Sequence, residues 1–123
     1  MKLLLISIFG VLGILSRYSI DTILSNKNYN LPISTILANL IGCILCGFIF
    51  TYFNHRPHLS FNLYQALIIG FCGGLTTFSS YSLQAVTMAQ SGQLDKSILY
   101  LVLSPLLGCV SIYLGIKVSH FLS

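Results

Sequence analysis

The chain has 123 residues, of which 55% are apolar and only 7% are charged, and its mean hydropathy is +0.89. A soluble domain usually carries roughly 25% charged residues, so this composition excludes an ordinary soluble protein and predicts an integral membrane protein. The net charge of +4 comes from six scattered basic residues. Basic residues this dispersed do not form the patch that nucleic-acid binding needs.

Four segments of the chain are apolar over about the 20 residues that a membrane-spanning helix needs. We therefore expect an all-α fold with a single transmembrane domain over residues 1–123, in which the polar stretch 25–30 forms the first loop. The predicted spans are 2–24, 31–53, 61–89 and 96–118.

The first segment begins with Met1 and Lys2 before an apolar run, as a secretory signal peptide would. A cleavable signal ends in a small-residue cleavage site, whereas here Arg17 and Tyr18 follow the run, so we expect an uncleaved helix. Arg17 could reach the membrane interface or raise the local anion concentration at a vestibule. Asp21, one turn later, could pair with it.

Asn39 is the strongly polar residue in the interior of the second segment. Its amide could form a hydrogen bond between helices, typically worth about 1 kcal/mol, or bind a permeating ion, and its position alone favours neither.

Cys43 and Cys46 form a C-x-x-C pattern in the same segment. Because no second pair and no nearby histidine accompany them, we interpret both as packing residues rather than a redox or zinc site.

The third segment is unusually long, since its 29 residues would make a continuous helix of about 43 Å, against a hydrocarbon core of about 30 Å. Its centre, residues 73–77, reads GGLTT. Irregular polar backbone at membrane depth is tolerated where it is buried in protein or lines a wet cavity. Tilt could absorb the extra length, but the cluster favours two half-helices around an unwound centre, beside an ion or substrate path.

Small residues recur along one face of the fourth segment, at Ser104, Gly108, Ser111 and Gly115. Such a row is typical of a close-packing seam between helices, and it could also be a line of hydroxyls along a pore. Tyr100 lies one turn earlier on the same face. From the sequence alone we favour the seam.

Lysine and arginine are divided almost equally between the two sides that four spans would create, so orientation is weakly specified. Four helices are also few to enclose a conduit alone. Both features favour a dimer, which could be antiparallel.

No nucleophile and base come together in the sequence pattern, so we expect no enzyme. His55 and His58 lack the further ligands that a zinc site needs.

The run at residues 73–81 reads GGLTTFSSY, and it resembles the G-G-x-T-T-F-S-T-F pattern of the Fluc (CrcB) family of small bacterial fluoride channels. Residues 13–18, which read GILSRY, and 39–42, which read NLIG, are supporting matches. The length and the four-helix layout also match. The resemblance implies an antiparallel, dual-topology homodimer in the bacterial inner membrane. It implies passive export of fluoride, which relieves fluoride toxicity.

The resemblance also implies a structural sodium ion at the centre of the dimer. On this chain its ligands would be the main-chain carbonyls of Gly73 and Thr76 from both subunits.

The fluoride path that the resemblance implies would use Asn39, the ring edge of Phe78, Tyr100 and Ser104. The family has a second phenylalanine where this chain has Tyr81, whose hydroxyl could donate a hydrogen bond or obstruct the path.

Two other functions fit a small four-helix membrane protein. A proton-coupled multidrug transporter needs a carboxylate inside the membrane, but the chain has no glutamate, and its two aspartates, Asp21 and Asp95, lie near predicted helix ends. A non-transporting assembly protein would explain the seam on the fourth segment, but not the broken third segment with its paired threonines.

Overall fold

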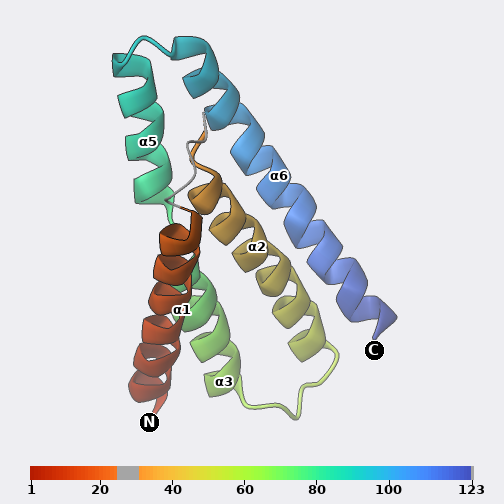
Figure 1. Cartoon of the computed structure of the whole chain (residues 1–123). Helices are drawn as coiled ribbons and strands as arrows, with labels where there is room; N and C mark the ends of the chain where they lie inside the picture. The colour runs from red at the N-terminus through yellow and green to blue at the C-terminus, as the bar shows by residue number, and fades with distance from the viewer. Residues whose placement is uncertain (25–30, 123) are drawn as a thin grey trace.

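The computed structural model describes residues 1–24 and 31–122, and most of them are helical (Figure 1). The stretch 25–30, predicted as the first loop, lies outside the described residues. The elements in chain order are α1 (Lys2–Leu24), α2 (Ile33–Asn54), α3 (Phe61–Gln65), the π-helix η1 (Ala66–Cys72), α4 (Gly73–Leu75), α5 (Phe78–Gln90) and α6 (Leu94–Phe121).

Four stretches of helix are long and apolar enough to cross a membrane, which confirms the predicted number of spans. The third of them, Phe61–Gln90, comprises α3, η1, α4 and α5. The fourth, Leu94–Phe121, extends the predicted 96–118 at both ends.

The third span is broken, as predicted, but the break lies on the threonines and not on the glycines. Thr76 (φ −86°, ψ 157°) and Thr77 (φ −150°, ψ 124°) are extended, a conformation that suits their β-branched side chains. Gly73 is helical, with φ −64° and ψ −35°. Gly74 serves close packing, because a Cβ there would lie 2.6 Å from the carbonyl oxygen of Gly10 in α1.

Helix α1 packs against η1 and α4, which precede the break, and α2 packs against α6 (Figure 1). Beyond the break, α5 lies against α6. The α2–α6 contact is close, because a Cβ on Gly115 would collide with the carbonyl of Ile44, and Ser111 beside it is buried. This stretch of α6 is therefore the seam that the sequence favoured.

Few side chains are buried within the single chain. A small core joins Tyr81 and Ala85 of α5 to Tyr100 of α6. Elsewhere large apolar side chains lie exposed, and in the most apolar stretch of α1 only 6% of the residues are buried. These exposed faces are available to lipid or to a second chain.

Candidate functional site

The break in the third span is bound to α2 by the side chain of Asn39. Its Oδ1 accepts a hydrogen bond of 2.8 Å from the Thr77 N–H, and its Nδ2 donates one of 3.3 Å to the Thr77 carbonyl. Asn39 thereby satisfies the Thr77 N–H, which the broken helix leaves without a helical acceptor, as a membrane interior requires. Because the amide nitrogen carries two hydrogens, this pairing leaves one N–H for another acceptor.

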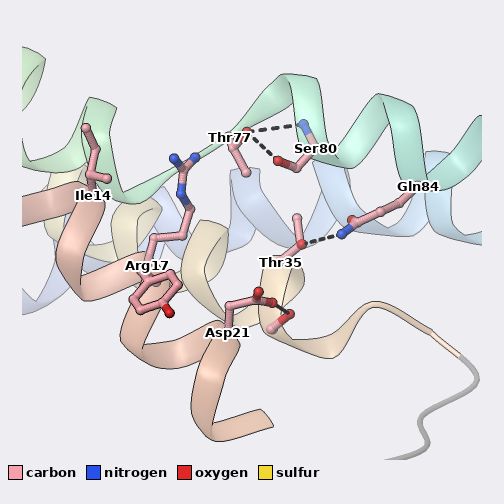
Figure 2. A pocket seen from close by; sticks show the side chains of 9 residues that line it. Ile14, Arg17, Asp21, Thr35, Thr77, Ser80 and Gln84 are labelled. Carbon is pink, nitrogen blue, oxygen red and sulfur yellow. Dashed lines mark hydrogen bonds between the residues drawn. The ribbon is translucent and has the colours of Figure 1, made fainter. Parts of the chain in front are cut away.

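Thr77 also forms the N-cap of α5, since its Oγ1 accepts a 3.2 Å hydrogen bond from the Ser80 N–H (Figure 2). The same Oγ1 lies 3.2 Å from the hydroxyl of Ser79 and 3.3 Å from that of Ser80. A helix N-terminus carries partial positive charge from its unpaired N–H groups. The start of α5 is therefore a favourable place for an anion.

A hollow of about 240 Å³, which we call the path hollow, lies beside the break. Four of its lining residues were predicted for the fluoride path: Asn39, Phe78, Tyr81 and Ser104. Its other lining residues are Cys43, Thr76 and Thr77. The structure thus brings together side chains from α2, α5 and α6 that are far apart in the sequence, while their roles stay predictions.

The two aromatic residues of the path hollow differ in exposure. Phe78 is 80% exposed in the single chain, whereas Tyr81 is only 7% exposed. Their ring centroids lie 5.7 Å apart. The Tyr81 hydroxyl donates a 2.7 Å hydrogen bond to the carbonyl of Leu101 in α6, so it is bound to the neighbouring helix.

Tyr100 belongs to a chain of hydrogen bonds next to the path hollow and is not among the residues that line it. Its hydroxyl donates to Gln84 Oε1 at 3.0 Å, and Gln84 Nε2 donates to Thr35 Oγ1 at 2.9 Å. The sequence reasoning missed Gln84 and Thr35. Gln84 carried a usable signal, because an amide inside an apolar span is the feature that singled out Asn39.

A second hollow, of about 270 Å³, also has Thr77 in its lining, and we call it the Arg17 hollow (Figure 2). Its lining residues are Ile14, Arg17, Tyr18, Asp21, Ser34, Thr35, Thr77, Ser80 and Gln84. Thr77 lines both hollows.

Arg17 extends from α1 toward the break, where its Nη1 donates to the Thr76 carbonyl at 3.5 Å, the long end for a hydrogen bond. Asp21 does not form the ion pair with Arg17 that the sequence suggested. Its Oδ1 accepts a 2.7 Å hydrogen bond from the Ser34 hydroxyl of α2 instead. The guanidinium is therefore a positive charge beside the break with no carboxylate bound to it among the residues described.

The carbonyls of Gly73 and Thr76 both lose their usual helical donors at the break. The i+4 donor for Gly73 would be the Thr77 N–H, which bonds to Asn39. The donor for Thr76 would be the Ser80 N–H, which bonds to the Thr77 hydroxyl. Backbone carbonyls freed in this way are suitable ligands for a sodium ion. Gly73 is also exposed, so a second subunit could approach it.

Comparison with known proteins supports the resemblance over nearly the whole chain. A family model described as CrcB-like protein, Camphor Resistance (CrcB), matches residues 4–116. A protein of Stutzerimonas stutzeri is 40% identical over 112 residues, which cover 90% of each chain. One of Pseudomonas putida is 33% identical over 117 residues, covering 94% of each.

A protein of Azobacteroides pseudotrichonymphae is 31% identical over 121 residues, covering 98% of this chain and 97% of that protein. All three relatives are named fluoride-specific ion channel FluC. The family match and these identities show that the chain belongs to the CrcB family.

Proposed function

We propose that this chain forms a passive, fluoride-selective channel that lets fluoride leave the cell and so relieves its toxicity. The observation that carries the proposal is the path hollow, where an amide, two aromatic rings and a hydroxyl gather beside a broken helix. The relatives named fluoride-specific ion channels lend it direct support. The four spans and the family indicate a multi-pass protein of the bacterial inner membrane, and a channel rather than an enzyme.

The groups in the path hollow suit an anion that is small and strongly hydrated. Such an ion enters a narrow pore only where hydrogen-bond donors replace its water, so selectivity follows from pore size and donor placement. Asn39 has an N–H to spare after binding Thr77. Ser104 adds a hydroxyl, and the positive ring edges of Phe78 and Tyr81 can face an anion.

The Arg17 hollow is suited to be the vestibule through which fluoride reaches the break. The Arg17 guanidinium and the N-terminus of α5 both attract negative charge there. The hydrogen-bonded side chains of Thr35, Gln84 and Tyr100 run from this hollow to α6. Fluoride would therefore meet hydrogen-bond donors in both hollows that Thr77 lines.

The functional unit in this proposal is an antiparallel dimer of two copies, with two fluoride pathways. Phe78 is 80% exposed in the single chain, which leaves one side of the path hollow open. A second copy packed on this face would close the hollow against lipid. The weak charge asymmetry of the loops fits a chain that inserts in both orientations.

A sodium ion at the dimer centre is part of the same proposal. The carbonyls of Gly73 and Thr76, freed at the break in each subunit, would hold it. The bound ion would offset the repulsion between four carbonyl dipoles brought together, and so would join the two subunits. Arg17 also donates to the Thr76 carbonyl, so it shares that oxygen with the cation.

The experiment that tests the function is fluoride efflux from liposomes. Purified protein is reconstituted into vesicles loaded with potassium fluoride or potassium chloride, and release is followed with ion-selective electrodes after valinomycin is added. We expect rapid release of fluoride and none of chloride. Absence of fluoride release from correctly folded protein would refute the proposal.

The path itself is tested by Phe78→Ile, which removes a ring edge from the path hollow while keeping an apolar side chain. We expect a large loss of fluoride efflux. Phe121→Ile is the matched control, because Phe121 is also largely exposed, at 90%, but lies at the end of α6. Equal efflux from the two variants would remove Phe78 from the path.

A further inference from the structure

Pro105 lies inside α6, one position after Ser104, which lines the path hollow. Proline has no backbone N–H, so it cannot donate to the carbonyl four residues earlier. That carbonyl belongs to Leu101. In a membrane an unsatisfied carbonyl is costly, because no water is available to replace the missing donor.

The hydroxyl of Tyr81 supplies this missing donor from a different helix. It donates to the Leu101 carbonyl at 2.7 Å, the most common length for a bond between two oxygens. Tyr81 is 7% exposed, so the side chain that carries this hydroxyl is buried. The hydroxyl thus takes over the donor role that a backbone N–H has in an uninterrupted helix.

This hydrogen bond holds the Tyr81 ring at the end that carries the hydroxyl. On one side the ring packs edge-on against Tyr100, with centroids 5.0 Å apart and planes at 60°. On another it contacts Phe78, with centroids 5.7 Å apart. With the hydroxyl bound to α6, the ring has little freedom to rotate out of the path hollow that it lines.

We propose that Pro105 and the Tyr81 hydroxyl act together as a positioning device for the fluoride path. Pro105 leaves the Leu101 carbonyl without a donor, the Tyr81 hydroxyl binds it, and the ring edge is thereby held toward the passing ion. The hydroxyl is then a structural donor and does not bind fluoride. The proposal rests on the proposed channel function.

The sequence allows the Leu101 carbonyl to be observed alone. Leu101-Val102 is the only place where a valine follows a leucine. Protein labelled with ¹³C at the leucine carbonyl and ¹⁵N at valine therefore contains a single ¹³C–¹⁵N peptide pair, which gives one carbonyl signal in an HNCO-type NMR spectrum. The chemical shift of that carbon reports the hydrogen bonding of its oxygen.

The test compares the wild type with Tyr81→Phe, Pro105→Ala and the double variant, by this carbonyl shift and by fluoride efflux. In the wild-type background, Tyr81→Phe should move the carbonyl signal upfield and lower efflux about five-fold, the worth of one hydrogen bond. In the Pro105→Ala background the residue 105 N–H already binds the carbonyl. There, Tyr81→Phe should change both readouts much less.

Three outcomes would overturn the proposal. The carbonyl signal could fail to move with Tyr81→Phe in the wild-type background, a comparison that needs no Pro105 variant to fold. The loss of efflux could be equal in both backgrounds, or it could come with a changed selectivity for fluoride over chloride, as expected if the hydroxyl bound fluoride itself. Absence of efflux from the wild type would refute the channel function instead, because the carbonyl comparison does not depend on flux.

Discussion

Replacing Asn39 with alanine should weaken the whole fold, because this side chain carries both hydrogen bonds between α2 and the break. The variant loses the acceptor for the Thr77 N–H and the donor to the Thr77 carbonyl. Hydrogen bonds between membrane helices are worth about 0.6 kcal/mol on average, and a buried N–H left unpaired costs about 1–3 kcal/mol. We expect the free energy of unfolding to fall by about 2 kcal/mol.

The measurement is reversible unfolding in mixed micelles, titrated with SDS and followed by the far-ultraviolet circular dichroism of the helices. Asn54→Ala is the matched control, because Asn54 is the last residue of the same helix and is exposed. Asn39→Asp adds a second comparison, since a carboxylate keeps the acceptor for Thr77 N–H but loses the donor. It should be destabilised at least as much as Asn39→Ala, because it places a charge inside the membrane and sets a carboxylate oxygen against the Thr77 carbonyl. It should also conduct poorly, because its negative charge repels fluoride.

Equal unfolding midpoints for Asn39→Ala and Asn54→Ala would refute this reasoning. The Asn39 amide would then contribute nothing to holding the break. A loss of fluoride efflux in that case would have to come from the spare N–H toward the path hollow alone.

Two further predictions concern packing and the cation. Gly115→Ala should destabilise the α2–α6 contact by about 1–3 kcal/mol, because the new Cβ would collide with the Ile44 carbonyl. Gly108→Ala should be nearly neutral, since its Cβ would meet only Cys43 Sγ at 3.5 Å. The same unfolding titration checks both, and equal losses would contradict the packing argument. Exchanging sodium for N-methyl-D-glucamine should weaken the dimer and slow fluoride efflux, as read by light scattering and by the vesicle assay, and re-adding sodium should restore both. A dimer and an efflux rate indifferent to sodium would exclude the central site.

The hydrogen bonds at the break explain how an irregular segment can exist at membrane depth. The Thr77 N–H, the Thr77 carbonyl and the Ser80 N–H all have side-chain partners. The carbonyls of Gly73 and Thr76 lose their usual helical donors to these side chains, and Arg17 donates to the Thr76 carbonyl instead. The same pairing that stabilises the break therefore exposes the oxygens that a cation could bind.

Much of the candidate site could be predicted from the sequence, because a polar residue inside an apolar span stands out. Asn39, Phe78, Tyr81 and Ser104 were all selected in that way or through the family pattern, and the structure gathers them in one hollow. Gln84 was missed, although it carries the same signal. Its place between Tyr100 and Thr35 depends on three helices meeting, which no local pattern reveals.

The position of the break shows more clearly what could not be predicted from the sequence. Glycine is the usual breaker, so the sequence pointed to the whole 73–77 cluster, yet Gly74 is helical because α1 packs against it. Likewise the sequence left open whether the Tyr81 hydroxyl donates a hydrogen bond or obstructs the fluoride path. The answer depends on Leu101, which lies 20 residues away.

The sequence by itself determined that the chain has four membrane spans, that the third is interrupted, and that it belongs with a family of small channels. Apolar length, polar clusters and motifs are local properties, so they can be read without a fold. Only the tertiary structure decided which atoms meet at the interruption. The hydrogen bond that holds the interruption joins Asn39 to Thr77, 38 residues apart, and the one that holds the Tyr81 ring joins it to Leu101, 20 residues apart. Tertiary packing brings such pairs together.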